Sequence, residues 1–176
     1  MTDPLENMEF IADTREKERH NSQYLFRDQY IVHRGRRIKV FNAVPVVRKC
    51  LKYGDYSLSG FESQVGVERK TKADFESSLT GGRLESQGTN LFEKIPYRVI
   101  AIEASYSDMW IPDDERLLNF KCAPGAICSL VIDGVPVMMC GDRRHAELFT
   151  HAFLMKAYKR LALGKEGSLI KPERRE

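Results

Sequence analysis

Short apolar runs of strand length fill the first part of the chain, and helical periodicity begins only after Lys70. Turn residues separate the runs, and their β-branched and aromatic content is typical of strands. We expect strands over residues 8–13, 30–33, 37–40, 55–58, 64–70, 97–103 and 135–139, a strand or an irregular piece over 46–51, and helices over 73–79, 84–95, 124–132 and 142–163. In this order, a series of strands comes first and is followed by helices that alternate with strands. Such an order predicts an α/β fold with a central mixed β-sheet flanked by α-helices.

The composition excludes several classes of protein. The 176 residues, 42% apolar and 30% charged, suit one domain with a sizeable core. No apolar run approaches the roughly 18–20 residues of a membrane span, and residues 1–7 lack the hydrophobic stretch of a signal peptide. We therefore expect a cytoplasmic protein that does not enter a membrane. The formal net charge of +3 is too small to indicate a nucleic-acid partner by itself.

The cysteines and histidines do not form a recognisable metal site. The four cysteines, at positions 50, 122, 128 and 140, form no CxxC pair, and the four histidines do not complete a set of zinc ligands. We expect buried, reduced thiols instead. His145 and His151 are expected on the surface of the last helix or at an interface, rather than as metal ligands.

The informative residues are Asp55, Glu68 and Lys70, which stand at neighbouring ends of two expected strands. Because side chains alternate along a strand, Glu68 and Lys70 point from the same face. If the two strands pair as a hairpin, Asp55 can face Glu68 across the ladder. Two carboxylates beside a lysine suit Mg²⁺, which polarises a phosphoryl oxygen, and the ammonium can orient the attacking water. The alternative is an exposed charge pattern without chemistry.

Further charged residues surround this set. Asp13 and Glu103 each end a strand, and Asp74 lies four residues after Lys70, where it can face back towards that lysine. Neighbouring strand ends are where open α/β sheets place their chemistry. Because side chains alternate along a strand, Arg69 points to the face opposite that of Glu68 and Lys70. We expect Arg69 either to contact DNA or to hold Asp13 or Asp74 in an internal ion pair.

Gly54-Asp55, Glu68-Arg69-Lys70 and Asp74 together read GD…ERKxxxD. This string resembles the motif of the XPF-type structure-specific endonucleases, a branch of the PD-(D/E)XK restriction-endonuclease-like fold. The similarity continues outside the motif, in residues 11–16, 75–83, 97–103 and 126–146. These segments resemble the family's opening strand, its helix with a glycine-arginine step, its next core strand and its closing elements. The resemblance implies the restriction-endonuclease-like fold over residues 8–163.

The resemblance also implies a role for each matching residue. The implied catalytic residues are Asp13, Asp55, Glu68, Arg69, Lys70 and Asp74. Asp55 and Glu68 would bind the divalent metal, Mg²⁺ or Mn²⁺, and Lys70 would assist the attacking water, leaving 5′-phosphate and 3′-hydroxyl ends. Arg15, Glu16 and Arg83 would lie nearby, with the two arginines against DNA.

A basic hairpin is a second candidate for contact with DNA. Arg34 and Arg36 stand in its turn, and Arg37 begins its second strand. A site that cleaves phosphodiesters needs cations along the backbone on either side, and these arginines could supply them. The alternative is a solvated surface. The hairpin looks like an elaboration of the family's fold.

We expect a flexible N-terminus over residues 1–7, an XPF-type nuclease domain over 8–163, and a polar tail over 164–176 without the helix-hairpin-helix module of many relatives. The chain looks like the stand-alone forms of bacteria and their phages. The resemblance predicts a Mg²⁺-dependent endonuclease acting on branched or flap DNA in repair, recombination or replication. The alternatives are a non-catalytic DNA-binding subunit and a junction-resolving or restriction-like nuclease. Family habit suggests a homodimer formed by the last two helices.

Overall fold

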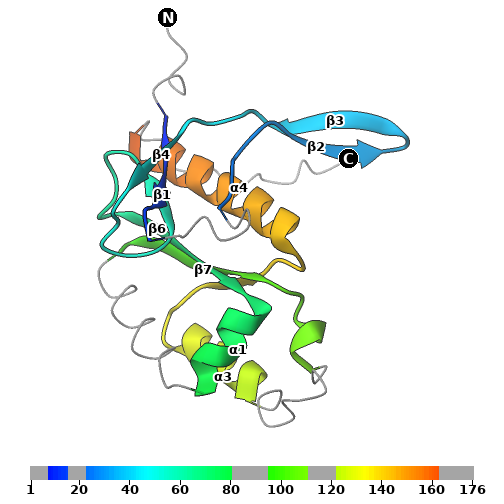
Figure 1. Ribbon diagram of the computed structural model, residues 1–176, viewed down its shortest axis with the longest axis vertical. Helices are drawn as coiled ribbons and strands as arrows, with labels where there is room; N and C mark the ends of the chain where they lie inside the picture. Colours follow the sequence, from blue (N-terminus) through cyan, green and yellow to red (C-terminus); the bar gives the residue numbers. More distant parts are fainter. Residues whose placement is uncertain (1–7, 16–22, 81–94, 111–121, 163–176) are drawn as a thin grey trace, which may run out of the picture.

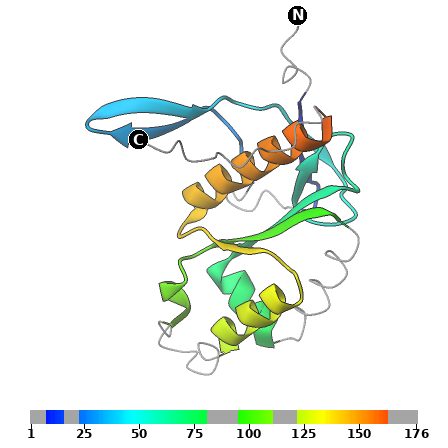
Figure 2. The ribbon, with the colours of Figure 1, turned by 180° about the vertical axis from the view of Figure 1, so that it is seen from behind.

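The computed structural model describes residues 8–15, 23–80, 95–110 and 122–162. The elements follow in the order β1 (Phe10–Asp13), β2 (Gln29–His33), β3 (Arg36–Phe41), β4 (Val46–Lys49), β5 (Tyr56–Leu58), β6 (Val65–Thr71), α1 (Lys72–Thr80), β7 (Tyr97–Glu103), the 3₁₀ helix η1 (Ser107–Trp110), α3 (Cys122–Ile132), β8 (Val137–Met139) and α4 (Arg143–Ala162). Helices cover both faces of the main sheet (Figure 1), and the view from behind shows the same layers (Figure 2). The predicted α/β fold is therefore confirmed.

Six strands form one mixed sheet in the order β4-β1-β5-β6-β7-β8, and β2 and β3 form a separate two-stranded sheet. Strand β5 runs antiparallel to both β1 and β6, while β7 runs parallel to both β6 and β8. The register of β6 and β7 places Thr71 opposite Glu103. The carboxyl ends of these two parallel strands therefore meet at one edge of the sheet, where the expected site residues lie.

Alternation along the strands divides the buried side chains between two cores. On one face, Phe10, Tyr56 and Val67 pack in the core that α4 covers. On the other face, Ile100 and Ile102 pack in the core that α1 and α3 cover. Because every second residue changes face, the position of a polar residue at a strand end decides which helical layer it joins.

The buried face of α4 includes polar residues as well as the apolar residues that the sequence places on one side of this helix. Thr150 and His151 are both buried, and His151 is 1% exposed. Its ring stacks on Phe41 at 4.5 Å between centroids and stands edge-on to Phe10 and Phe26. The expectation of a surface histidine at this position was wrong, because the end of β3 and the segment before β2 cover that side of the helix.

The prediction of buried thiols was also wrong for two of the cysteines. Cys50 and Cys128 are exposed, and Cys140 is partly buried. Burial raises the pKa of the Cys140 thiol to about 11, so that thiol is protonated at neutral pH. All three are free thiols.

Some expectations fall outside the described residues. They concern Glu16, Arg83, the helix expected over 84–95, the N-terminal residues 1–7 and the tail 164–176. Among the helices that the structure does describe, none combines the length and the apolar character needed to cross a membrane.

Candidate active site

The turn before β5 fixes Asp55 at the edge of the sheet. Gly54 has a φ of +74°, and a Cβ atom at this position would lie 3.0 Å from the carbonyl oxygen of Val67. Glycine therefore allows the chain to pass close against β6. The backbone N–H of Asp55 donates to the Val67 carbonyl at 2.8 Å, and its carbonyl accepts the N–H of Asp13, also at 2.8 Å. Asp55 is thus held between β1 and β6 before β5 begins.

Three acids form a row, the acidic row, across β1, β5 and β6. Continuing the two antiparallel registers one step beyond Tyr56 places Asp13 opposite Asp55, and Asp55 opposite Glu68. Lys70 lies on the same face of β6 as Glu68, with its Nζ 3.5 Å from Glu68 Oε1. The hairpin pairing expected from the sequence is present, and it brings Asp55, Glu68 and Lys70 to one face.

The carboxylate of Asp13 is already engaged. Asp13 is 2% exposed, and its oxygens accept the backbone N–H of Arg15 at 2.9 Å and the Nε–H of Arg15 at 2.8 Å. Burial acts to raise the pKa of Asp13, but the hydrogen bonds and the charge of Arg15 outweigh burial and lower that pKa. Asp13 therefore carries a stable negative charge whose partner is Arg15.

Asp55 and Glu68 fit a hard divalent cation. They offer carboxylate oxygens from adjacent strands, and the Glu68 side chain is 24% exposed, so solvent reaches it. The described residues contain no cluster of three or more His, Cys, Asp or Glu suited to a metal. A cation held here would take its other ligands from water and phosphate oxygens. Mg²⁺ is commonly bound in this way, through one or two carboxylates, and Mn²⁺ accepts the same ligands.

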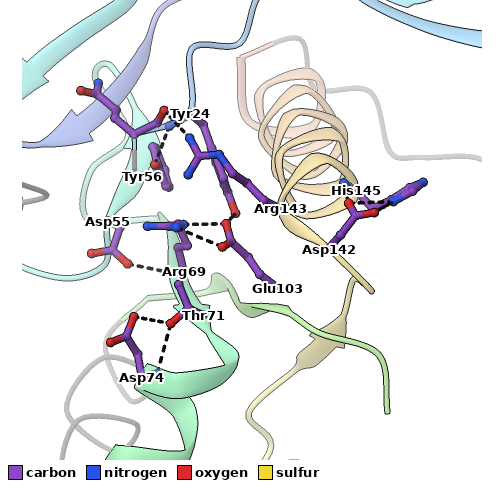
Figure 3. A network of polar contacts seen from close by, with 11 residues as sticks. Tyr24, Asp55, Tyr56, Arg69, Thr71, Asp74, Glu103, Asp142, Arg143 and His145 are labelled. Atoms are coloured by element: carbon purple, nitrogen blue, oxygen red, sulfur yellow. Dashed lines mark hydrogen bonds and ion pairs between the residues drawn. The ribbon is translucent and has the colours of Figure 1, made fainter. Parts of the chain in front are cut away.

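Arg69 lies on the opposite face of β6, as period 2 predicts, and forms a two-point ion pair with Glu103 (Figure 3). Its Nε lies 2.7 Å from Glu103 Oε1, and one terminal guanidinium nitrogen lies 3.0 Å from Oε2. Both side chains are 9% exposed. Of the two alternatives for Arg69, the internal ion pair is present, but its partner is Glu103 and not the expected Asp13 or Asp74, because the parallel register of β6 and β7 brings Glu103 to its side.

Tyr24 completes this group, which we call the Arg69 cluster and which consists of Tyr24, Arg69, Glu103 and Arg143. The Tyr24 hydroxyl donates to Glu103 at 2.8 Å, and its ring stacks on Tyr56 at 4.9 Å (Figure 3). The guanidinium groups of Arg69 and Arg143 lie 5.4 and 5.3 Å from the ring centroid. Burial, and then the bond to Glu103, raise the pKa of Tyr24, so the hydroxyl remains a donor.

Sequence reasoning missed Tyr24 because it stands in a charged loop without periodicity. The one available signal is the alternation of two aromatic residues, Tyr24 and Phe26, within that loop. Both are fully buried.

The two faces of the sheet are connected through one backbone group. The N–H of Arg69 donates to Asp55 Oδ2 at 2.7 Å, while the side chain of Arg69 is fixed by Glu103 on the other face. The Arg69 cluster is therefore joined to the stretch of β6 backbone that holds the Asp55 carboxylate.

Asp74 lies in the first turn of α1, where Thr71 caps the helix and the two side chains are hydrogen-bonded to each other (Figure 3). The Asp74 N–H donates to Thr71 Oγ1 at 3.1 Å, and the Thr71 hydroxyl donates to Asp74 Oδ2 at 2.6 Å. The carboxylate thus turns to Thr71 rather than to Lys70. The helical i,i+4 spacing does not apply, because Lys70 still belongs to β6. A catalytic role of Asp74 stays a prediction.

The arginines expected to contact DNA that the structure describes are exposed, but they lie in two separate parts of it. Arg34, Arg36 and Arg37 are exposed on the β2–β3 hairpin. The side chain of Arg15 is 63% exposed, and its guanidinium also donates to the Leu51 carbonyl at 2.6 Å.

Comparison with known proteins identifies the family. The model of the ERCC4 domain matches residues 12–153. A stretch of 98 residues, 55% of the chain, is 34% identical to "Putative ATP-dependent RNA helicase MJ1505" of Methanocaldococcus jannaschii. The match covers 11% of that protein, so the chain spans about a tenth of the length of this relative.

Solved structures give the same assignment of the fold. XPF from Aeropyrum pernix matches with a TM-score of 0.62 and 23% identity, over 89% of this chain and 68% of that one. The same protein in complex with DNA matches with a TM-score of 0.61 and 24% identity, over 86% of this chain and 65% of that one. The predicted resemblance to an XPF-type nuclease domain is confirmed, and the chain belongs to the ERCC4 domain family.

Proposed function

We propose that this chain is a metal-dependent endonuclease that hydrolyses phosphodiester bonds in branched or flap DNA. The observation that carries the proposal is the placing of Asp55, Glu68 and Lys70 on one face, at the end of β6 where α1 begins. Membership of the ERCC4 domain family and the fold shared with an XPF structure in complex with DNA support DNA as the substrate.

The chemistry divides between the acids and the lysine. Asp55 and Glu68 would hold Mg²⁺ or Mn²⁺, which when bound polarises a phosphoryl oxygen and offsets negative charge. Lys70 is largely buried, with a side chain 10% exposed, and its ammonium has hydrogen atoms to spare beyond the one directed at Glu68. Its role is to orient the attacking water and to stabilise charge in the transition state. The water oxygen bonds to phosphorus and loses a proton to solvent, the bond between phosphorus and the 3′ oxygen breaks, and the 3′ oxygen takes up a proton, which gives 5′-phosphate and 3′-hydroxyl ends.

The Arg69 cluster supports this arrangement from the other face. Arg69 and Glu103 are both nearly buried, so each needs the other to remain charged at low cost. If Glu103 were removed, the guanidinium would lack its partner and β6 would shift at the point where it holds Asp55. We therefore assign Glu103 and Tyr24 to positioning, and not to contact with the substrate.

A homodimer through α3 and α4 is part of the proposal. The end of α3 exposes Val131 and Ile132, at 56% and 83%, which supports an apolar contact there. Light scattering of the purified protein tests it: twice the chain mass supports the dimer, and the mass of one chain contradicts it.

A cleavage panel tests the nuclease activity. The protein is incubated with flap, fork, junction and linear DNA, with Mg²⁺ or Mn²⁺ and with a chelator. Asp55→Asn and Glu68→Gln should each reduce the rate by about 10²-fold or more, because the metal contributes several kcal/mol to the transition state. Glu62→Gln is the matched control, since Glu62 lies at the opposite end of the β5–β6 hairpin and pairs with Lys49.

The outcomes separate the alternatives. Cleavage that needs metal and is lost in both site variants, with Glu62→Gln unaffected, supports the enzyme. Equal cleavage by all four proteins contradicts the site. Binding of branched DNA without any cleavage indicates a non-catalytic subunit.

A further inference from the structure

The β2–β3 hairpin takes no part in the acidic row or in the Arg69 cluster. We propose that it is a β-ribbon that enters the major groove of a duplex arm of the DNA substrate. The inference rests on the proposed nuclease function for the identity of the partner. It adds that this chain grips a double-stranded arm of that substrate through the hairpin, away from the scissile bond.

The hairpin is built to project rather than to fill the core. Figures 1 and 2 show it reaching outward on the side of the molecule where α4 begins. No residue from Gln29 to Phe41 is buried. A two-stranded sheet alone is marginally stable, so its base needs anchors. Arg144 supplies one by donating to the Tyr30 carbonyl at 2.7 Å, and Phe41 supplies another by stacking on His151.

The base of the hairpin is connected to the Arg69 cluster. Arg144 anchors the hairpin, and the preceding residue, Arg143, lies against the ring of Tyr24. Arg143 also donates to the carbonyl of Gln23, next to Tyr24, at 2.8 Å. The first turn of α4 thus fixes the base of the hairpin to the group that orients Asp55.

Positive charge is concentrated in this part of the chain. Residues 29–54 contain seven lysines and arginines and no aspartate or glutamate. The formal net charge is +3, so without these seven charges it would be −4. On the hairpin, Lys39 pairs with Asp28 at 2.7 Å. Arg34, Arg36 and Arg37 have no acidic partner within the part of the chain that the structure describes, which leaves their charges available to an anionic partner.

Both faces of the ribbon carry cations. Cross-strand pairing places Tyr30, Val32, Arg37 and Lys39 on one face, and Ile31, His33, Arg36 and Ile38 on the other. Arg37 stacks on Tyr30, with its Cζ 4.1 Å from the ring centroid. The major groove admits a two-stranded β-ribbon and presents phosphates on both of its sides. A ribbon with cations on both faces matches a groove with phosphates on both sides. An acidic protein surface would instead contact only one face of the ribbon.

The backbone at the tip gives a separate observation. Arg34 and Gly35 have φ angles of +50° and +73°. Hairpin turns with two such residues favour Asn-Gly, because a bulky L-residue is disfavoured in the left-handed region. Arginine is therefore unfavourable for the turn at this position. A residue that is unfavourable for the turn but stands at an exposed tip is consistent with a function of its side chain, and a guanidinium is well suited to contact phosphate because it can donate two parallel hydrogen bonds.

The test measures binding by the full chain without catalysis. Fluorescence anisotropy follows a labelled duplex and a labelled single strand of equal length, in EDTA and at several salt concentrations. The double variant Arg34→Asn/Arg36→Gln should weaken duplex binding about tenfold or more and reduce the slope of log affinity against log salt by about two. Binding of the single strand should change less. Arg34→Asn alone should leave the melting temperature unchanged or raise it, which excludes misfolding.

The control variant removes two cations that are also exposed but lie elsewhere. Lys156→Gln/Lys159→Gln on α4 should bind the duplex as the wild type does, which supports a local role of the hairpin. Unchanged duplex binding in the hairpin variant would overturn the inference. Equal losses on duplex and single strand would also overturn it. Labelled polyglutamate in the same assay represents an acidic protein partner, and a hairpin variant that loses binding to it while duplex binding stays intact would overturn the inference as well.

The two proposals fail in different ways. A wild type that binds duplex through the hairpin but cleaves no DNA with Mg²⁺ or Mn²⁺ contradicts the nuclease proposal and supports the ribbon. A wild type that cleaves, with a hairpin variant that binds duplex equally well, contradicts the ribbon and leaves the nuclease standing.

Discussion

Replacing Gly54 by alanine perturbs the one turn that carries Asp55 past β6. At a φ of +74°, alanine would adopt a backbone conformation that disfavours any Cβ atom. Its methyl group would also lie 3.0 Å from the Val67 carbonyl oxygen and 3.4 Å from the Val67 carbonyl carbon. These are backbone atoms within a central strand, so they cannot move aside as a flexible side chain could.

The two effects add to a measurable loss of stability. The left-handed conformation costs about 1–2 kcal/mol for a residue with a side chain. Forcing an extra methyl group into a packed place costs about 1–3 kcal/mol more. The sum of about 2–5 kcal/mol corresponds to a fall in melting temperature of roughly 5–20 °C for a chain of this size.

Gly60→Ala is the matched control for this experiment. Gly60 has a φ of +81°, but a Cβ atom there would meet nothing within 4 Å. Gly60→Ala should therefore lose only the stability that the left-handed backbone conformation costs, about 1–2 kcal/mol. Urea unfolding and thermal melting of both variants separate this conformational cost from the cost of the steric clash at Gly54. Gly54→Ala should also weaken Mn²⁺ binding, because the methyl group displaces the backbone next to Asp55.

Equal destabilisation in the two variants would refute the reasoning about Gly54. So would a large loss of stability in Gly54→Ala with full Mn²⁺ affinity, since Asp55 would then not depend on the close passage of the chain.

Three further variants test other parts of the structure. Tyr24→Phe removes the hydroxyl that donates to Glu103 at 2.8 Å and should lower the free energy of unfolding by about 1–3 kcal/mol in urea; no change would show that the bond does not stabilise the fold. Burial lowers the pKa of His151 to about 4, so stability is complete above pH 6.5 and falls as the pH drops towards 4, because the unfolded chain binds the proton first. His151→Phe should flatten that decline between pH 7 and 5, and an unchanged decline contradicts the assignment. Thr71→Ala removes the cap of α1 and should cost about 1 kcal/mol in thermal melts, with Thr71→Ser as the tolerated control.

The edge of the sheet could be predicted because its signals are local. Short apolar runs fix β1, β5 and β6, and each run ends at or beside an acid whose face follows from period 2. The placing of Asp55 against Glu68 then needs only the hairpin between them, which is a short-range pairing. The family motif spans the same residues, so both routes lead to one site.

The Arg69 cluster could not be predicted because its contacts are long-range. Period 2 gives the face of Arg69 but not its partner, and Glu103 stands 34 residues away on a parallel strand. Tyr24 reaches the cluster from a loop 79 residues before Glu103. His151 was misplaced for a similar reason, since the apolar pattern of a helix does not reveal that a hairpin end covers its polar flank.

Mn²⁺ binding in the absence of DNA tests the central claim most directly. Isothermal titration or the paramagnetic resonance of free Mn²⁺ can follow it for the wild type, Asp55→Asn, Glu68→Gln and the control Glu62→Gln. A site made by two carboxylates on adjacent strands predicts binding in the wild type and the control, and loss in both site variants. Equal Mn²⁺ affinity in all four proteins would contradict it.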